Sequence, residues 1–290
     1  MTILLAQLIN SLVQGSIYVL IASGVTLIYG LTNNVMFAQG ALLMLGGYFT
    51  YGYIQAGIPI VLAIVLSIVT LGVIGVILER GLFSRVGGRA VNGFIISLGL
   101  IIVLENSVSK ATGGRTNVNI TMPVSGTWTW WGVVVPIQRV IVFGVAMATM
   151  AGLILVLRKT RLGWALRATA ENRVAAEFMG IPARRLMIGT FVVGCGLAAL
   201  GGSLLLTLVP LTPYVGDSVI VNAFAIAIIG GLGSVEGAVV AAMVIAFVEG
   251  LGGSYLEPAL TSVYGFAIMI IMLLVRPQGF VRGVKGAELH

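Results

Sequence analysis

Residues 60–78 read IVLAIVLSIVTLGVIGVIL, a run of nineteen residues that contains no charged side chain. A helix that crosses the roughly 30 Å hydrocarbon core of a membrane needs about twenty apolar residues, because each residue advances it by about 1.5 Å. The run continues a longer pattern: the first charged residue of the chain is Glu79, so residues 1–78 carry no Asp, Glu, Lys or Arg. A water-exposed surface cannot be built from such a segment, and it predicts membrane-spanning helices.

The composition of the whole chain agrees. Of its 290 residues 59% are hydrophobic and only 9% are charged, and the mean hydropathy is +1.11, whereas soluble domains contain about 25% charged residues. This predicts an all-α, polytopic membrane helical bundle that forms a single transmembrane domain over residues 1–290. It excludes a secreted disulfide scaffold and a nucleic-acid-binding protein. Because the chain has one Cys, Cys195, and one His, His290, we expect no intrachain disulfide and no metal or triad centre built on these residues.

Apolar runs of spanning length predict about eight or nine transmembrane segments. The stretch 219–252 is too long for one span, and its middle reads GGLGS at residues 230–234, a natural break. We therefore predict two segments there, 219–231 and 235–251, each short for a full crossing and discontinuous or tilted. The other expected spans are residues 3–29, 35–56, 60–78, 94–109, 137–157, 187–209 and 258–275.

Lys and Arg in short loops predict the orientation, because cytoplasmic loops are enriched in them. Thirteen of the sixteen fall in three clusters, within residues 80–89, 158–185 and 276–285, which we assign to the cytoplasm. The loop 110–136 then faces outward, and its Trp128, Trp130 and Trp131 suit a membrane-interface belt. Counting crossings backward puts the N-terminus outside, and the C-terminus is inside.

A faint internal repeat is visible. Residues 38–41 (AQGA) begin a pair of expected spans that ends at Arg80, and residues 235–238 (VEGA) begin a pair that ends at Arg276. Both pairs are expected to begin and end on the cytoplasmic side, as a parallel duplication would leave them. The alternative is that any two apolar hairpins resemble each other.

The longest charged segment, residues 158–186, is expected to contain a helix in addition to the cations that mark a cytoplasmic loop. We expect one helix from Thr169 to Met179, with Gly180 and Pro182 ending it. On a helical projection Ala168, Val174, Ala175, Phe178 and Met179 can share one flank. Such a helix could lie on the membrane interface or present small residues to a cytoplasmic protein, and the cations could also act as a topology signal alone.

Within this segment, residues 170–181 (AENRVAAEFMGI) resemble the cytoplasmic coupling loop of ABC importer permeases, and more narrowly of the branched-chain amino-acid (LIV) permease family. Three further blocks resemble family signatures, in the same order along the chain. They are residues 30–40, with Gly30, Asn33, Asn34, Gln39 and Gly40; residues 216–238, with GD, AFA and GGLGS followed by Gly237 and Ala238; and residues 276–280, RPQGF.

The resemblance implies an integral permease subunit of an ATP-driven importer in a bacterial or archaeal cytoplasmic membrane. Its expected partners are two cytoplasmic ABC ATPases, a paralogous permease or a second copy of this chain, and an extracytoplasmic substrate-binding protein. No G-x-x-x-x-G-K-[ST] motif occurs in the sequence, so ATP and Mg²⁺ are expected in the partner ATPase and no cofactor in this chain. Motion of the ATPases would push the 169–181 segment. The residues that the resemblance assigns to this coupling are Glu171, Arg173, Ala175, Ala176, Met179 and Gly180.

The chain departs from the family pattern in the first block. Where family members commonly carry His it has Gln39, and where an acidic residue often follows it has Ala41. The cargo could therefore differ from leucine, isoleucine and valine, and urea, short amides and aromatic acids are the alternatives that the resemblance leaves open.

Polar residues inside apolar segments are the candidates for the substrate path, since they are costly in a membrane. These are Asn33, Asn34, Gln39, Asn222 and Glu249. The alternative for the amides is hydrogen bonding between helices, worth about 0.6 kcal/mol per contact on average, and for Glu249 a structural partner such as a neighbouring hydroxyl. A rival function is a secondary transporter driven by Na⁺ or H⁺, in which Glu249 and Glu236 would bind the ion.

Overall fold

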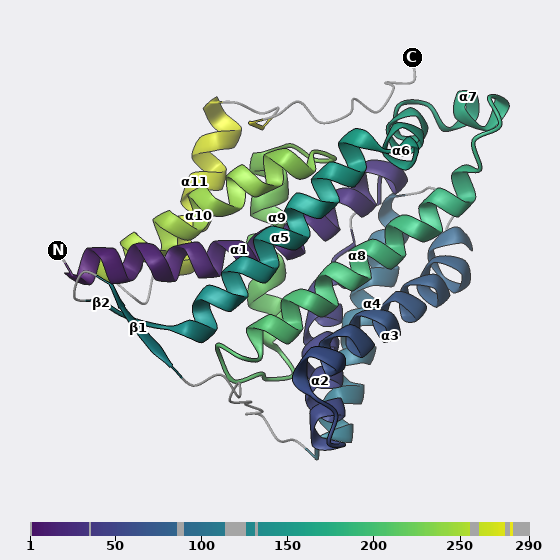
Figure 1. The fold of residues 1–290 in the computed structure, drawn as a ribbon. Coiled ribbons are helices and arrows are strands. Elements are labelled where there is room, and N and C mark those ends of the chain that lie inside the picture. Colours follow the sequence, from purple (N-terminus) through teal and green to yellow (C-terminus); the bar gives the residue numbers. More distant parts are fainter. Residues whose placement is uncertain are drawn as a thin grey trace.

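The computed structural model describes residues 2–34, 36–85, 90–113, 126–130, 133–255, 261–275 and 279–280. Figure 1 shows a bundle of helices with one short β-hairpin at its edge. Within the described residues the elements are α1 (Thr2–Thr32), α2 (Gln39–Gln55), α3 (Ile60–Gly81), a short 3₁₀ helix (Phe83–Arg85), α4 (Ala90–Ala111), β1 (Thr127–Trp130), β2 (Val133–Pro136), α5 (Ile137–Lys159), α6 (Arg161–Glu171), α7 (Arg173–Phe178), α8 (Ala183–Leu205), α9 (Val215–Gly230), α10 (Val235–Tyr255) and α11 (Thr261–Val275).

The predicted polytopic helical fold is confirmed. Among the described residues, six helices (α1, α3, α4, α5, α8 and α10) are long and apolar enough to cross a membrane. Helices α2 and α9 have 17 and 16 residues, which gives lengths of about 24–26 Å, short of the roughly 30 Å core. The described part of α11 has 15 residues. The predicted break between the two late segments is also confirmed: α9 ends at Gly230, Gly231 and Gly233 adopt positive φ, and α10 begins at Val235.

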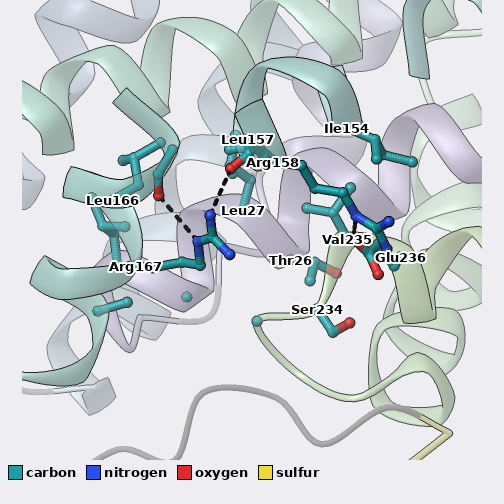
Figure 2. Close-up of a pocket in the computed structure, with 15 residues that line it drawn as sticks. Thr26, Leu27, Ile154, Leu157, Arg158, Leu166, Arg167, Ser234, Val235 and Glu236 are labelled. Atoms are coloured by element: carbon teal, nitrogen blue, oxygen red, sulfur yellow. Dashed lines mark hydrogen bonds and ion pairs between the residues drawn. The ribbon is translucent and has the colours of Figure 1, made fainter. Parts of the chain in front are cut away.

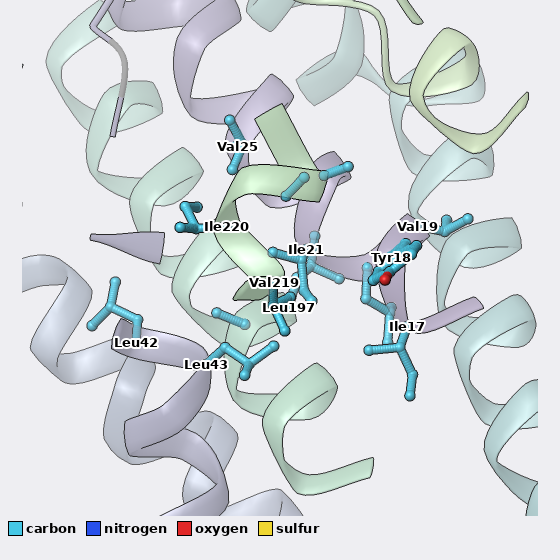
Figure 3. Packing of buried hydrophobic residues seen from close by; sticks show 14 of the residues in the cluster. Ile17, Tyr18, Val19, Ile21, Val25, Leu42, Leu43, Leu197, Val219 and Ile220 are labelled. Carbon is cyan, nitrogen blue, oxygen red and sulfur yellow. The ribbon is translucent and has the colours of Figure 1, made fainter. Parts of the chain in front are cut away.

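Helix α1 is the central element, and it runs antiparallel to α10. Gln7 near its start donates a hydrogen bond to the carbonyl of Gly250, 2.7 Å away. At its other end, a Cβ on Gly30 would lie 3.3 Å from the Cα of Gly233. Figure 3 shows the core beside it, where Ile21 and Val25 of α1 lie among Leu42 and Leu43 of α2, Leu197 of α8, and Val219 and Ile220 of α9.

The start of α2 differs from the prediction. We expected a span from residue 35 that begins at the cytoplasmic side, but α2 begins at Gln39, inside the bundle. The Gln39 side chain is fully buried, and its Nε2 donates to the carbonyl of Gly194, halfway along α8, over 2.6 Å. The contact is possible because Gly24 of α1 has no side chain there: a Cβ would lie 2.5 Å from Gln39 Nε2. Residues 36–38 therefore lead back into the bundle before the helix starts.

The two halves of the suspected repeat each form a helical hairpin. Helices α2 and α3 pack on each other, as do α10 and α11, so both hairpins exist. Gln39, however, lies beside Gly24 of α1, whereas Gly233, which precedes α10, lies beside Gly30. These contacts lie six residues apart along α1, which corresponds to about 9 Å of helix.

Glycines let α8 pack closely against α2. A Cβ at Gly46 would lie 2.5 Å from the Cα of Ala199. A Cβ at Gly202 would overlap the carbonyl oxygen of Leu43 and lie 2.9 Å from the amide nitrogen of Gly47. Small residues commonly allow such backbone contact between membrane helices. The α2–α8 interface therefore depends on the absence of side chains at these positions.

The two ends of the bundle carry different structures, which α5 connects (Figure 1). One end has the antiparallel hairpin of β1 and β2, with Thr127 paired to Pro136, which the sequence did not predict. Its Trp128 is 63% exposed; the expected role of Trp130 and Trp131 in the interface belt lies outside the residues whose side chains are described. The other end has α6 and α7. The cations of the C-terminal cluster, Arg276, Arg282 and Lys285, also lie outside the described residues.

Candidate functional site

The segment between α5 and α8 contains two helices, and the single helix predicted from Thr169 to Met179 is wrong. Helix α6 ends at Glu171, and Asn172 is extended, with φ −152° and ψ 101°. The Asn172 side chain accepts a hydrogen bond of 3.0 Å from the amide of Ala175. Asn is a strong N-cap residue because its side-chain oxygen satisfies an amide of the first turn. Asn172 therefore ends α6 and starts α7, although its neighbours all tolerate a helix.

Helix α7 projects its apolar side chains away from the bundle. Phe178 is 87% exposed, and Met179 and Val174 are exposed as well. On the opposite side Ala176 is buried, and its carbonyl accepts from the amide of Ile181. Large exposed apolar groups on one short helix indicate a contact surface rather than a solvated loop.

The predicted coupling residues gather at this surface. Arg173 and Glu177 form an ion pair of 3.0 Å along α7. Gly180 ends the helix with φ +82°, a conformation that favours glycine, and no atom lies within 4 Å of where its Cβ would be. Exposed members of the predicted set are Glu171, Arg173, Ala175, Met179 and Gly180, whereas Ala176 is buried beneath them.

A second group of polar residues lies inside the bundle, where α1, α9 and α10 meet. The hydroxyl of Tyr18 donates to Glu249 Oε2 over 2.9 Å and accepts from Asn222 Nδ2 over 2.8 Å. All three residues are buried. On the side of α11, a Cβ at Gly265 would lie 2.9 Å from Glu249 Oε1. The structure thus brings together the predicted Asn222 and Glu249, and it supplies the neighbouring hydroxyl considered as a structural partner of Glu249.

Tyr18 joins these two candidates, although no sequence pattern predicted its role. A tyrosine in a long apolar helix resembles any other large apolar residue, so its pattern carries no signal for a polar contact. The helpful signal was the ionisable Glu249 itself, since a buried carboxyl needs a hydrogen-bond donor. The donor lies 231 residues away in sequence, which no local pattern can indicate.

Replacing Tyr18 by Phe should destabilise the chain measurably. A single hydrogen bond in a membrane protein contributes about 0.6 kcal/mol on average, but this change leaves both a buried carboxyl oxygen and a buried amide without their partner. We therefore expect a loss of about 1–3 kcal/mol, seen as a lower melting temperature of the purified chain in detergent. Tyr214→Phe, at a 56% exposed tyrosine, is the control, and equal melting of the two variants would contradict a stabilising role for the cluster.

The remaining path candidates surround the start of α2. Asn33 is exposed, with φ 50°, while Asn34 is buried beside Gly93 of α4. Among the described residues, no hydrogen-bond partner reaches Asn34 Oδ1 or Gln39 Oε1. Nearby, the Phe37 ring stacks on Phe224 of α9, with centroids 4.1 Å apart. Among the described residues no hydrogen bond joins Asn34 or Gln39 to the Tyr18 cluster, although Gly40, next to Gln39, packs on Ile220, two residues before Asn222.

The pair of carboxylates considered as ion ligands is not brought together. Glu236, in the first turn of α10, forms an ion pair of 2.5 Å with Arg158 at the end of α5. Glu249 lies thirteen residues further along the same helix, a separation of about 20 Å. The described residues also contain no group of three or more His, Cys, Asp or Glu side chains that could hold a metal ion. A shared ion site of Glu236 and Glu249 is thus excluded by their positions.

Comparison with known proteins places these features in context. Residues 7–273 match the family described as the branched-chain amino acid transport system permease component. The chain is 31% identical over 293 residues to the high-affinity branched-chain amino acid transport system permease protein LivH of Escherichia coli, covering 96% of this chain and 95% of that one. It is 30% identical to the corresponding protein BraD of Pseudomonas aeruginosa, covering 96% and 95%.

A solved structure described as PsaBC from Streptococcus pneumoniae in complex with Fab has a similar fold. The TM-score is 0.51 at 16% sequence identity, and the match covers 93% of this chain and 91% of that one. At this identity the likeness concerns the fold alone. The sequence relatives, in contrast, match over nearly the full length of both chains.

Proposed function

The chain belongs to the permease component family of branched-chain amino acid transport systems, and from this premise we propose that it forms the membrane path of an importer that is driven by a separate ATPase. As an integral multi-pass protein of the inner membrane, it is a transport subunit. Its cargo in this proposal is a branched-chain amino acid, delivered by an extracytoplasmic binding protein.

The proposal assigns ATP binding and hydrolysis to partner chains. The sequence contains no P-loop motif, so two cytoplasmic ATPases with their ATP and Mg²⁺ would supply the energy. A second permease, either a paralogue or another copy of this chain, would complete the path. The exposed α7 surface, with Val174, Phe178 and Met179, supports this assembly because it offers an apolar contact at one end of the bundle.

Movement of the ATPases would be transmitted from α7 to the membrane-spanning helices α5 and α8 through short connecting segments. Only Thr160 separates α5 from α6, and α8 begins at Ala183, directly after the turn that ends α7. The ion pair of Arg158 with Glu236 also links the end of α5 to the start of α10. A push on α7 would therefore tilt α5 and α8 and act on the α9–α10 break, which favours one of two global arrangements over the other.

Five residues are proposed to act along the path: Asn33, Asn34, Gln39, Asn222 and Glu249. The buried amide oxygens of Asn34 and Gln39 are acceptors that a moving ammonium group could meet. Gln39 and Ala41 stand where the family pattern has His and an acidic residue. Urea, short amides and aromatic acids are therefore assayed as alternative substrates beside the branched-chain amino acids.

The observation that carries the proposal is the family match over residues 7–273. The test is gentle purification of the chain from its native membrane, with mass spectrometry of the proteins that accompany it. We expect an ATPase with a P-loop and a second apolar permease, and ATP-dependent uptake of labelled leucine, isoleucine or valine after reconstitution. A chain that is purified alone and transports with an ion gradient in place of ATP would refute the proposal.

The proposed orientation has the N-terminus outside and the C-terminus in the cytoplasm, and thiol labelling tests it. The native Cys195 is fully buried, so it provides a silent background. We introduce Phe178→Cys on α7 and Trp128→Cys on the hairpin, both at exposed positions. In cells that express the chain without its ATPase, so that α7 is uncovered, a membrane-impermeant maleimide should label only Trp128→Cys in intact cells and only Phe178→Cys in sealed inside-out vesicles. Labelling of both variants after detergent treatment is the control, and the reverse pattern would contradict the orientation.

A further inference from the structure

A cavity of about 370 Å³ lies at the end of the bundle that carries α6 and α7. Its walls come from the last turns of α1, the end of α5, the inner face of α6 and the turn between α9 and α10 (Figure 2). None of the predicted coupling residues lines it. The cavity is therefore distinct from the exposed α7 surface and from the buried Tyr18 cluster.

The cavity has charged groups of both signs on opposite sides. Figure 2 shows Arg167 of α6 on one side and the Arg158–Glu236 pair on the other, with Thr26 between them. The Arg167 guanidinium is oriented by the carbonyls of Leu157 and Gly163, at 3.3 and 3.4 Å. These are long, weak contacts, and a guanidinium has five N–H donors, so donors remain for a ligand. Glu236 uses Oε1 in its ion pair, which leaves Oε2 for a second donor.

A buried hydroxyl between these charges points to a ligand. Thr26 is fully buried, and among the described residues its Oγ1 has no hydrogen-bond partner. A buried polar group without a partner costs free energy, so the position favours an incoming donor or acceptor. Ser234, at the start of α10, adds a second hydroxyl on the same wall. Polar groups from four elements thus converge on one space: Thr26 of α1, Arg158 of α5, Arg167 of α6, and Ser234 and Glu236 at the start of α10.

The rest of the lining is aliphatic. Leu27 and Leu31 of α1, Ile154 and Leu157 of α5, and Leu166 of α6 form the apolar walls. A small number of placed polar groups in a mainly apolar cavity is typical of a small-molecule site. The two arginines outnumber the single carboxylate, so the cavity favours a carboxylate at Arg167, and the second oxygen of Glu236 accepts a donor from a cationic group of the same ligand.

We propose that this cavity binds a free aliphatic α-amino acid on the cytoplasmic side. Its carboxylate pairs with Arg167, its ammonium group with Glu236 and Thr26, and its side chain packs on the leucines. The assignment rests on the proposed function and orientation, since the cargo released into the cytoplasm has this chemistry. A bound molecule bridges α6 to the start of α10 and restrains the movement that transport requires. The site therefore acts as a product sensor that slows import when the cytoplasm is already supplied.

The test uses the whole importer in proteoliposomes that contain ATP. Binding protein and labelled L-leucine are added outside, unlabelled L-leucine is loaded inside in graded amounts, and the initial rate of uptake is measured. We expect internal L-leucine to lower this rate. L-leucine methyl ester, which lacks the carboxylate, 4-methylpentanoate, which lacks the ammonium group, and glycine, which lacks the side chain, should each inhibit at least about tenfold more weakly.

Variants identify the cavity as the cause. Arg167→Gln should raise the half-inhibiting concentration of internal L-leucine at least about tenfold, and Thr26→Val should raise it as well. Arg161→Gln removes a cation from an exposed position of the same helix that does not line the cavity, and it should leave inhibition unchanged. If internal L-leucine has no effect on the wild-type rate, or if Arg167→Gln and Arg161→Gln are inhibited alike, the proposal is overturned.

Three further measurements distinguish failure of the cavity assignment from failure of the proposed function. Uptake into vesicles with an empty lumen tests the proposed function alone, and it can fail independently. The melting temperature of the purified complex with L-leucine, without binding protein, tests the cavity directly: a rise with L-leucine but not with its methyl ester supports the site, and its absence counts against it.

Inhibition that appears only in liposomes without phosphatidylethanolamine would assign the cavity to that zwitterionic headgroup instead and overturn the amino-acid assignment.

Discussion

Gly180→Arg should reduce ATP-dependent uptake by the reconstituted importer more than tenfold while the chain still folds and inserts. Gly180 ends α7 with φ +82°, and it is exposed, with open space where a Cβ would be. A side chain in the left-handed region costs about 1–2 kcal/mol, which shifts the turn that sets α7 relative to α8. The substitution also puts a long cation beside Met179, on the surface proposed to contact the ATPase. Uptake and ATPase stimulation by loaded binding protein are the two measurements.

Gly57→Arg is the matched control. Gly57 lies in the turn between α2 and α3, with φ +84° and likewise no atom within 4 Å of its Cβ position. The backbone strain and the added charge are therefore the same, but the position is remote from α7. We expect near wild-type uptake from Gly57→Arg. Ala175→Glu, which adds an opposite charge on α7, should uncouple transport like Gly180→Arg, and normal uptake in both α7 variants would contradict the coupling role.

Gly202→Ala should destabilise the folded chain, and it should do so far more than Gly189→Ala on the same helix. The new Cβ would overlap the carbonyl oxygen of Leu43 and lie 2.8 Å from its carbon, and both atoms belong to the backbone of α2. Backbone atoms cannot turn aside as a flexible side chain can, so the two helices must separate. Overpacking of this kind costs about 1–3 kcal/mol or more. The melting temperature of the purified chain and its yield in the membrane should both fall.

Gly189→Ala tests the same change on the same helix without the contact. Gly189 is exposed, and nothing lies within 4 Å of its Cβ position. Alanine is favoured over glycine inside a helix by about 0.8–1 kcal/mol in water, so this variant should melt at the wild-type temperature or above it. If Gly202→Ala melts no lower than Gly189→Ala, the close α2–α8 packing does not hold in the membrane.

The membrane helices could be predicted from the sequence because the signal is local. Residues 60–78 are apolar throughout, so α3 had to cross, and the glycines of residues 230–234 mark the α9–α10 break where the structure has it. Gly180 was identified as the end of α7 for the same local reason. The single helix predicted from Thr169 to Met179 was wrong, because the side chain of Asn172 caps a second helix where its neighbours would otherwise continue the first.

The features that escaped prediction depend on residues far apart in the chain. The start of α2 inside the bundle follows from Gln39 meeting Gly194, 155 positions later. The cluster at Glu249 needs the hydroxyl of Tyr18, and the cavity beside α6 needs four separate elements to converge. In each case the polar residue could be recognised in the sequence, but its partner could not. Tertiary packing determines that partner, and a hydropathy pattern contains no information about it.

The position of α2 has a consequence for how the protein is made. The side chain of Gln39 leaves the ribosome 155 residues before the carbonyl that it bonds to, and synthesis at about 5–20 residues per second makes this delay about 8–30 s. Throughout that time α1 and α2 must reside in the bilayer without α8 and α10, with the Gln39 amide and the Tyr18 hydroxyl unpaired. Native contacts of such long sequence separation also slow folding. The N-terminal helices are therefore expected to depend on the insertion machinery to shelter them until the second half of the chain arrives.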